Sequence, residues 1–316
     1  MSEHQSVEHP LPEPRVVINT RPVERAALLT QHLQAAGLAV AEMPMLALQS
    51  RPTTDDDVTK MHQWLIGEYK ALVIVSPTAA ASGLAVWQTL EREVEGRPHE
   101  QEVLTVFGRL KSPSPLIAVG DATATVLNHA HLDTASYPVR QPKTANNEGM
   151  LAMPEIERLQ AGDKVLIWRG LGGRRLLVDA LQARGVHVDS IAWYERVMPI
   201  AARVQYQAWR QAFLTRHAKV APSKQTKPIV VISSGTAFEH WMTVVNETSV
   251  ASSLTQSDCM SADDEMQYQQ TLTLSDFTYI VLGARLTNQV AKQQLDHWQV
   301  DDLAPETILA AINATT

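Results

Sequence analysis

The sequence predicts two similar α/β domains, each built on a parallel β-sheet. Three observations support this prediction. At 316 residues the chain is long for a single hydrophobic core. Short apolar, β-branched runs alternate with amphipathic stretches, which is typical of parallel strands joined by right-handed helical crossovers. Finally, two sequence modules each occur twice along the chain.

The first repeated module reads as a strand, a helix and a second strand. Its two copies are Val16–Ile18 with Leu33–Val40, and Val165–Ile167 with Leu181–Val188. The helix-ending segments match at five of eight positions. Gly37 and Gly185 occupy the position where each helix must stop before the next strand begins.

The second module carries two strand-to-helix turns. Its matching segments are Leu72–Ala79 with Val230–Ala237, and Leu116–Thr123 with Tyr279–Leu286. A Leu-Asp pair closes each copy. The modules follow in the order one, two, one, two, so the chain is interpreted as a duplicated half.

Composition and charge narrow the class of protein. Hydrophobic residues make up 45% of the chain, enough for packed cores. The lone Cys259 cannot form an internal disulfide, and Met1–Leu11 lacks the pattern of a secretory signal. No apolar run is long enough to span a membrane. We therefore expect a cytoplasmic protein, and the net charge of −7 argues against a nucleic-acid partner.

Three polar segments interrupt the repeated modules. They lack helical periodicity and are predicted to be surface loops. The segments are Glu91–Ser114, Thr215–Lys227 and Asn246–Ser275.

Several predicted strands end in turns that leave backbone N–H groups exposed. Such turns follow at Thr20–Pro22, Ser76–Pro77, Gly120–Asp121, Ser234–Gly235 and Gly283–Ala284. Ligands of open α/β sheets bind beyond the carboxyl ends of strands, where helix N-termini favour anions. We expect these turns to face a cleft between the domains and to bind a molecule with many carboxylates. The alternative is that these residues only cap helices.

Arginines near the predicted strand ends fit the same kind of ligand. Arg21 and Arg169 follow the two copies of the first strand, and Arg285 follows the last strand-end glycine. Guanidinium groups suit bidentate binding of carboxylates. Arg174 and Arg175 are equally well explained as solvated surface residues.

Motifs for cofactors and metals are weak. The run Gly170–Gly173 does not have the spacing of a dinucleotide site, and no phosphate-binding loop is present. The histidines show no ligand spacing beyond His129 and His131, and no cysteine pair exists. We expect no cofactor and no metal. Tyr194, in the strand-like segment Ile191–Val197, is explained on these grounds alone as a packed strand residue.

The order of several short motifs resembles the uroporphyrinogen-III synthase family. The motifs are Asn19–Pro22, Pro44–Leu48, Val75–Pro77, Ala118–Ala124, Asn147–Leu151, Lys164–Gly170, Tyr194–Arg196 and Ser233–Gly235. Each motif is loose by itself. Their order, from about Arg15 to Ala304, is specific.

The resemblance implies two doubly wound parallel-sheet (flavodoxin-like) domains joined by a two-stranded β connector, with the duplicated halves exchanged between the domains. The implied parts are residues 14–43 plus 199–316 for domain 1, 50–191 for domain 2, 44–49 and 192–198 for the connectors, and 1–13 for an N-terminal extension.

The reaction implied by the resemblance is the cyclisation of hydroxymethylbilane, a linear tetrapyrrole, to uroporphyrinogen III. Ring D is inverted through a spiro intermediate. The family uses no cofactor, and the substrate carries many carboxylates. An acid must assist departure of the ring A hydroxyl, and the resemblance assigns this role to Tyr194. Serine and threonine positions of the family bind substrate. The predicted site is therefore Tyr194 as the catalytic residue, with Arg21, Ser76, Thr123, Arg169, Ser234 and Thr287 binding substrate.

One position departs from the family pattern. The family usually has a threonine after its last Gly-x-Arg element, whereas this chain has Leu286 there, followed by Thr287. Two alternatives remain at this point. One is a non-catalytic tetrapyrrole- or anion-binding module, which the presence of Tyr194 disfavours. The other is a two-domain nucleotide- or sugar-binding enzyme, which the lack of a phosphate loop disfavours. A monomer is expected.

Overall fold

The computed structural model describes residues 15–95, 114–130, 137–173, 175–218, 226–254 and 271–314. Within these ranges the chain up to Ala47 and from Val197 onward forms one compact unit, unit 1, and Leu48–Arg196 forms unit 2. The predicted N-terminal extension lies outside the described residues. Among the helices of the described ranges, none has the length and apolar character needed to cross a bilayer.

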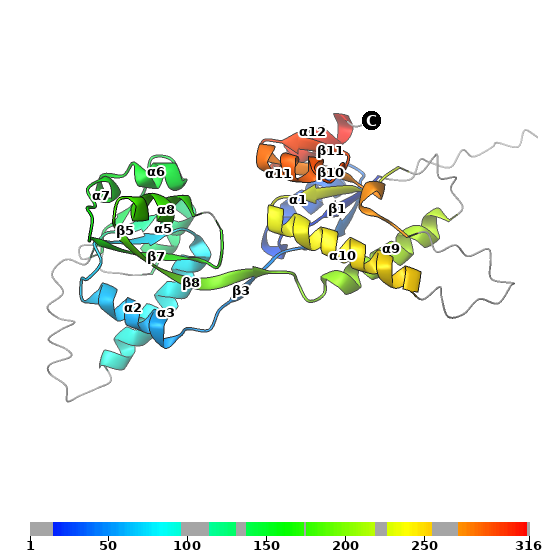
Figure 1. The fold of residues 1–316 in the computed structure, drawn as a ribbon. Coiled ribbons are helices and arrows are strands. Elements are labelled where there is room, and N and C mark those ends of the chain that lie inside the picture. The colour runs from blue at the N-terminus through cyan, green and yellow to red at the C-terminus, as the bar shows by residue number, and fades with distance from the viewer. Residues whose placement is uncertain are drawn as a thin grey trace, which may run out of the picture. The chain divides into compact units, whose positions relative to one another are not determined.

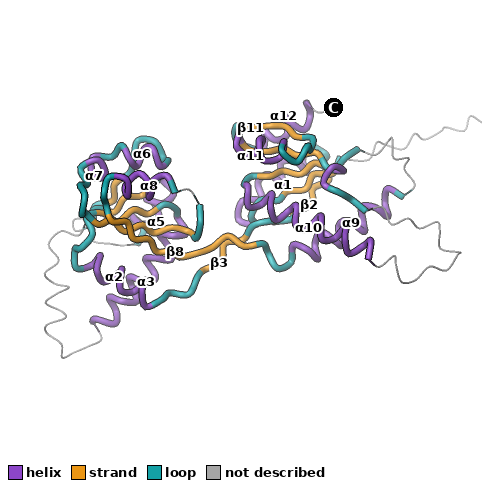
Figure 2. The backbone as a smooth tube through the Cα atoms, viewed as in Figure 1, coloured by secondary structure: helices purple, strands orange, loops and turns teal. Residues whose placement is uncertain are grey.

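Unit 1 is built on a five-stranded sheet in the order β11-β10-β9-β1-β2, and every neighbouring pair is parallel. Its strands are β1 (Val16–Asn19), β2 (Ala39–Glu42), β9 (Ile229–Ile232), β10 (Thr278–Leu282) and β11 (His297–Val300). Its helices are α1 (Val23–Ala35), α9 (Ala202–His217), α10 (Gly235–Leu254), α11 (Gly283–Ala291) and α12 (Pro305–Ala314), with a short 3₁₀ turn, η2 (Leu274–Asp276). Figures 1 and 2 show the sheet with helices along it.

Unit 2 is built on a six-stranded sheet in the order β3-β8-β7-β4-β5-β6. Its strands are β3 (Ala47–Ser50), β4 (Ala71–Ile74), β5 (Leu116–Ala118), β6 (Val139–Arg140), β7 (Lys164–Gly170) and β8 (His187–Val197). Its helices are α2 (Asp55–Leu65), α3 (Pro77–Glu95), α5 (Asp121–Asn128), α6 (Asn147–Leu151), α7 (Pro154–Glu157) and α8 (Leu176–Ala183). The pairs from β6 to β8 are parallel. The predicted class, two doubly wound parallel α/β sheets, is confirmed.

The duplicated modules are exchanged between the two sheets. The first module (β1, β2) pairs with the second copy of the second module, because Ile18 lies opposite Val230. The second copy of the first module (β7, β8) pairs with the first copy of the second, because Leu166 lies opposite Leu72. Each sheet therefore contains one copy of each module, taken from different halves of the chain.

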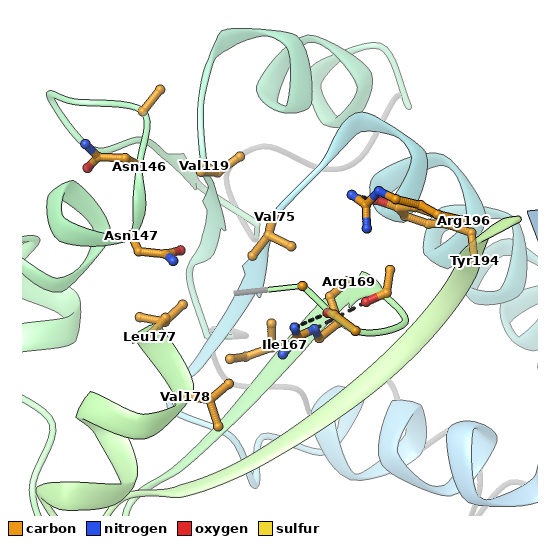
Figure 3. Close-up of a pocket in the computed structure, with 14 residues that line it drawn as sticks. Val75, Val119, Asn146, Asn147, Ile167, Arg169, Leu177, Val178, Tyr194 and Arg196 are labelled. Atoms are coloured by element: carbon orange, nitrogen blue, oxygen red, sulfur yellow. Dashed lines mark hydrogen bonds between the residues drawn. The ribbon is translucent and has the colours of Figure 1, made fainter. Parts of the chain in front are cut away.

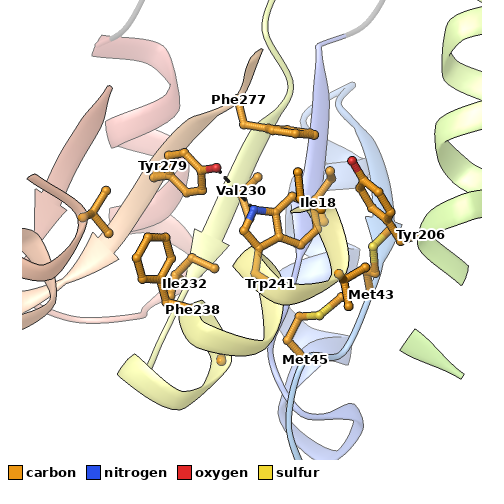
Figure 4. Packing of buried hydrophobic residues seen from close by; sticks show 14 of the residues in the cluster. Ile18, Met43, Met45, Tyr206, Val230, Ile232, Phe238, Trp241, Phe277 and Tyr279 are labelled. Carbon is orange, nitrogen blue, oxygen red and sulfur yellow. Dashed lines mark hydrogen bonds between the residues drawn. The ribbon is translucent and has the colours of Figure 1, made fainter. Parts of the chain in front are cut away.

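Helices cover both faces of each sheet, which explains why the strands are almost continuously apolar. In unit 1, α1 and α12 bury one face and α9, α10 and α11 the other. Figure 4 shows Trp241 of α10 surrounded by apolar side chains, with its indole N–H donating to the Tyr279 hydroxyl at 3.3 Å. In unit 2, α2, α3 and α5 cover one face and α6, α7 and α8 the other.

The two repeated glycines end their helices as predicted. Gly37 follows α1 with a φ of 83°, and Gly185 follows α8 with a φ of 79°. This left-handed conformation costs glycine little, whereas a Cβ would strain it. Because each helix stops there, the chain turns directly into β2 or β8.

Two strands lie at the boundary between the units. β3 is the edge strand of the unit 2 sheet and lies beside β8. The amide of Arg51, just after β3, donates to the carbonyl of Trp193 in β8 at 3.0 Å. The unit boundaries fall at the start of β3 and at the end of β8.

The predicted loop boundaries were wrong at three places, because helices continue into the segments. α3 runs to Glu95, α9 to His217 and α10 to Leu254. Near the end of α10, the hydroxyls of Thr248 and Ser249 are satisfied within the helix, because they donate to the carbonyls four residues earlier. Most of the remaining parts of these segments, residues 96–113, 219–225 and 255–270, lies outside the described residues.

Candidate active site

The pocket of interest lies in unit 2, beyond the carboxyl ends of the central strands. The chain places β5 and β6 on one side of β4, and later β7 and β8 on the other side. The strand order thus reverses between β4 and β7, and such a switch point is where open α/β sheets bind ligands. The pocket has a volume of about 290 Å³. It is lined by Val75, Val119, Ala145, Asn146, Asn147, Ile167, Arg169, Gly170, Gly172, Gly173, Leu177, Val178, Tyr194 and Arg196 (Figure 3).

Tyr194 of β8 brings a hydroxyl group to this pocket. The residue is well buried, with only 3% of its surface exposed. Its phenol oxygen lies 3.1 Å from the Ser76 hydroxyl and accepts a longer hydrogen bond, 3.5 Å, from Arg196. Two of the residues predicted for the site, Tyr194 and Ser76, are therefore in direct contact.

A β-bulge in β8 sets the direction of the Tyr194 side chain. Arg169 pairs with Ala192, but the next residue, Gly170, pairs with Tyr194, so Trp193 has no partner in the ladder. Side chains of a regular strand alternate between faces. Because of the extra residue, Trp193 and Tyr194 both join the core cluster on the α2–α3–α5 face.

Gly170 is needed for Tyr194 to lie where it does. A Cβ added at Gly170 would meet two ring carbons of Tyr194 at 2.6 Å and its hydroxyl at 3.0 Å. Real Cβ atoms essentially never approach other atoms so closely. The ring therefore lies directly against the β7 backbone, and only glycine leaves space for it.

Ser76 also caps a helix. Its hydroxyl oxygen accepts the Ala79 amide at 3.1 Å at the start of α3, which is the N-cap interaction that the alternative interpretation of the strand ends predicted. The hydroxyl makes this contact and the contact with Tyr194 together. Capping and site formation are combined in one side chain.

Arg169 places a guanidinium at the pocket wall. It donates from Nε to the carbonyl of Gly170 at 3.3 Å, and from Nη2 to that of Gly172. Burial lowers the pKa of Arg169, and the charges of Arg175 and Arg196 lower that pKa further. Positive charges held together in this way favour an anionic ligand.

Three polar residues of the pocket were not predicted individually. Asn146 and Asn147 lie at the start of α6, where the Asn146 side chain accepts the Gly149 amide at 2.7 Å. Arg196 lies two residues after Tyr194. All three adjoin or fall within the motifs Asn147–Leu151 and Tyr194–Arg196, and period-two alternation along the strand could have indicated Arg196.

Thr123 is placed differently from the prediction. It lies in α5 and is 1% exposed. It is absent from the pocket lining, where Val119 represents the same strand end. Its neighbours Ala124 and Leu127 belong to the core cluster, so this part of the helix faces the sheet.

Three predicted residues, Arg21, Ser234 and Thr287, belong to unit 1 and not to the pocket. Arg21 donates to the carbonyl of Leu303 at 3.4 Å, and its pKa is lowered by burial and then by the charge of Arg25. Ser234 caps α10, since its hydroxyl accepts the Ala237 amide at 3.2 Å.

Thr287 and Leu286 point to different surroundings on α11. The Thr287 hydroxyl donates within the helix to Gly283 at 3.0 Å and contacts the Gln299 amide oxygen at 3.0 Å. Leu286, which replaces the usual threonine of the family pattern, is 2% exposed and packs in the unit 1 core. A hydroxyl at position 286 would be buried among apolar side chains.

The strand registers relate the two units residue by residue. Ile18 lies opposite Val230 as Leu166 lies opposite Leu72. Counting three residues onward from Ile18 and from Leu166 reaches Arg21 and Arg169. The two arginines are thus equivalent, and each is partly buried and has a lowered pKa.

No cluster of three or more histidine, cysteine, aspartate or glutamate side chains suited to a metal ion occurs in the described ranges. The polar side chains of the pocket carry two amides, one hydroxyl and two guanidiniums. Guanidiniums only donate hydrogen bonds, so this set suits an anion and not a cation.

Comparisons with known proteins agree with the motif order. A family model described as uroporphyrinogen-III synthase HemD matches residues 27–262. The chain is 26% identical over 182 residues to a uroporphyrinogen-III synthase of Proteus mirabilis, covering 57% of this chain and 80% of that one. It is 25% identical over 232 residues to the enzyme of that name from Escherichia coli, covering 72% and 79%.

A solved structure supports the fold. A crystal structure of a uroporphyrinogen III synthase variant from the extreme thermophile Thermus thermophilus matches with a TM-score of 0.54 and 12% identity, covering 95% of this chain and 98% of the other. The family model spans well over half of the sequence. The chain therefore belongs to the uroporphyrinogen-III synthase family.

Proposed function

We propose that this chain cyclises hydroxymethylbilane to uroporphyrinogen III, with ring D inverted, and that the pocket of unit 2 holds the reacting end of the substrate. The observation that carries the proposal is the placement of the Tyr194 hydroxyl. It lines a pocket at the switch point of the sheet and lies between Ser76 and Arg196. Family membership supplies the reaction.

The first step is the departure of the ring A hydroxyl. Tyr194 donates its proton to that hydroxyl as the carbon–oxygen bond breaks, so water leaves, Tyr194 becomes the phenolate, and an electron-poor azafulvenium cation remains. The pKa of a tyrosine side chain in water is about 10, so near neutral pH the side chain is uncharged and still carries the proton that it donates. No charged acid has to be buried beside the substrate.

The later steps rearrange carbon–carbon bonds. The substituted carbon of ring D attacks the azafulvene carbon and forms the spiro intermediate. The bond from ring D to its original bridge carbon then breaks. That bridge carbon forms a new bond to the other α-carbon of ring D, so the ring is inverted. A ring proton is lost at the end, and the Tyr194 oxygen can accept it, so the enzyme returns to its first state and the net by-product is one water.

The pocket walls contribute orientation and exclusion of water. Val75, Val119, Ile167 and Leu177 give an apolar lining, which suits a pyrrole ring (Figure 3). Asn146, at the other side of the same pocket, offers a polar edge. Spontaneous closure gives the isomer without inversion, so holding the bent chain matters more than acceleration alone.

The carboxylates of the substrate are assigned to the arginines and caps. Arg169 binds them within the pocket. In unit 1, Arg21, Ser234 and Thr287 are proposed to bind carboxylates of the substrate, and in unit 2 Thr123 is proposed to support the pocket wall from α5. Charge-assisted pairs with guanidinium are the strong form of such contacts.

The test is a coupled assay. Hydroxymethylbilane is generated freshly, the products are oxidised, and type III and type I isomers are separated by chromatography. We expect mainly type III. Type I alone, formed at the rate without protein, would contradict the proposal and favour a non-catalytic tetrapyrrole-binding role.

A further inference from the structure

We propose that Arg196 is a positioning residue for Tyr194. Its guanidinium holds the phenol ring, directs the hydroxyl proton, and stabilises the negative charge that develops on the oxygen as the proton leaves. This inference rests on the proposed role of Tyr194 in cyclisation.

The contact between the two side chains is the first argument. The Arg196 Cζ lies over the Tyr194 ring, 5.5 Å from its centroid, and Nη2 lies 3.5 Å from the hydroxyl oxygen. Figure 3 shows the guanidinium beside the ring at one side of the pocket. A cation over an aromatic face is attracted by it, so one side chain contacts both the ring and the oxygen.

The geometry of β8 explains why the side chains of Tyr194 and Arg196 contact each other. Tyr194 and Arg196 are two residues apart on β8, so their side chains emerge on the same side of the strand beyond the bulge. The ring cannot retreat toward β7, because it already lies against Gly170. The backbone of Gly170 and the guanidinium of Arg196 together restrict the ring.

Hydrogen-bond accounting indicates where the phenol proton points. A guanidinium has donors and no acceptor, so in the contact with Arg196 the Tyr194 oxygen must accept. The Ser76 oxygen already accepts the Ala79 amide. The proton of Tyr194 is therefore directed away from Arg196. It can point to the Ser76 oxygen, which has a second lone pair and can accept again, or to a bound substrate oxygen.

The second role of Arg196 is electrostatic. When Tyr194 gives its proton to the leaving hydroxyl, its oxygen becomes negative, and a guanidinium fixed beside that oxygen stabilises the transition state more than the ground state. Arg169 differs, because its described hydrogen bonds run to the backbone carbonyls of Gly170 and Gly172. Arg196 is the arginine that contacts the hydroxyl.

The decisive experiment is a double-mutant cycle of Arg196→Gln with Tyr194→Phe, measured as kcat and KM for hydroxymethylbilane with isomer analysis. In the otherwise wild-type protein, Arg196→Gln should lower kcat by about 10- to 100-fold with little change in KM, the range for one charge-assisted hydrogen bond. In the Tyr194→Phe background it should lower kcat by no more than about twofold.

Two further variants complete the design. Arg196→Lys keeps the charge and should recover part of the lost kcat. Arg184→Gln removes the same charge from an exposed site just after α8, before β8 begins, and should leave kcat and KM unchanged. Thermal midpoints within a few degrees of wild type show that each variant is folded.

The outcomes separate the hypotheses. An unchanged kcat with a raised KM in Arg196→Gln, or equal losses in both backgrounds, would overturn the inference and make Arg196 a simple carboxylate ligand. If wild-type protein itself yields only type I product, the proposed function fails instead.

Discussion

The contact between Tyr194 and Gly170 determines where the proposed acid lies. Two ring carbons lie only 2.6 Å from the position that a Cβ of residue 170 would take. The bulge at Trp193 brings Tyr194 opposite Gly170 in the ladder. The hydroxyl position thus depends on a missing side chain in one strand and an extra residue in the next.

Gly170→Ala should displace the Tyr194 ring. The added methyl would clash at 2.6 Å with ring carbons, so we expect lower stability and a fall in kcat larger than the change in KM. Denaturant unfolding and steady-state kinetics measure both. The control is the pair Gly170→Ala with Tyr194→Ala: if removing the ring does not reduce the stability cost of Gly170→Ala, the clash is not its cause.

Tyr194→Phe should lower kcat by about 100-fold, the usual effect of losing one acid or hydrogen-bond donor. Folding should be almost unaffected, because the ring that fills the space beside Gly170 remains. The coupled assay and a thermal melt test this. Unchanged kcat with type III product would remove Tyr194 from the mechanism.

At the residue scale, the sequence suggested candidate residues for the site more readily than it suggested the contacts that each residue makes. In unit 2, Tyr194 contacts Ser76 and lines the same pocket as Arg169. The burial of Thr123 was not predictable, because a threonine in the first turn of a helix can face either solvent or the sheet. The importance of Gly170 depends on a contact across two strands, which no local pattern encodes.

At the scale of elements, equivalent serines start equivalent helices. Ser76 caps α3 and Ser234 caps α10, each by accepting the amide three residues on, at 3.1 and 3.2 Å. The duplication therefore preserved the capping geometry in both units. Ser76 differs from its counterpart in that it also contacts the Tyr194 hydroxyl.

Ser76→Ala and Ser234→Ala form a matched pair for stability. Loss of an N-cap typically costs about 1 kcal/mol, so both variants should lose a similar free energy of unfolding in denaturant titrations. A much larger loss for Ser76→Ala would mean that its contact with Tyr194 contributes strongly to folding. A loss near zero in both would show that water replaces the cap.

At the scale of elements, the predictions that were wrong concern the ends of helices that are rich in polar residues. α10 continues through Glu247 and Thr248 to Leu254. Glu247 forms an ion pair with Arg203 of α9 at 2.6 Å, and Thr248 bonds within its own helix. Such contacts satisfy polar groups without producing apolar periodicity, so a search for periodicity ends the helix too early.

For the molecule as a whole, the internal repeat was the most informative sequence signal. It predicted the class of fold, and the family resemblance added the exchange of halves. The pairing of β1 with β9 and of β4 with β7 confirms both. The predicted domain limits remain a prediction at the precision of single residues.

Alkaline pH should destabilise unit 1. Burial raises the pKa of Tyr206 and of Tyr279 above the ordinary value of about 10. Above that pH the unfolded chain loses these protons first, so it binds fewer protons than the folded chain and the free energy of unfolding falls. Above about pH 10, each tyrosine lowers the free energy of unfolding by up to about 1.4 kcal/mol per pH unit. Below about pH 10 the tyrosines are protonated in both states and their full contribution to stability is present.

Tyr206→Phe tests this directly. The Tyr206 hydroxyl is buried and lacks a hydrogen-bond partner among the described residues, so the variant should equal or exceed wild type in stability at about pH 7 and decline less steeply above about pH 10. Tyr279→Phe is the comparison, because it removes a similar titration but also the contacts with Trp241 and Leu274. Identical alkaline slopes in all three proteins would contradict the argument.

The exchanged modules also impose an order in time. During synthesis β1 and β2 emerge first, but β9, their neighbour in the sheet, starts only at Ile229. Unit 2 is continuous from Leu48 to Arg196 and has all its strands before then. The apolar side chains of β1 and α1, among them Val17, Leu29 and Leu33, therefore lack their packing partners in the core of unit 1 until the rest of the unit has been synthesised. A nascent chain stalled before β9 should contain a protease-resistant unit 2 and an N-terminal segment that chaperones bind.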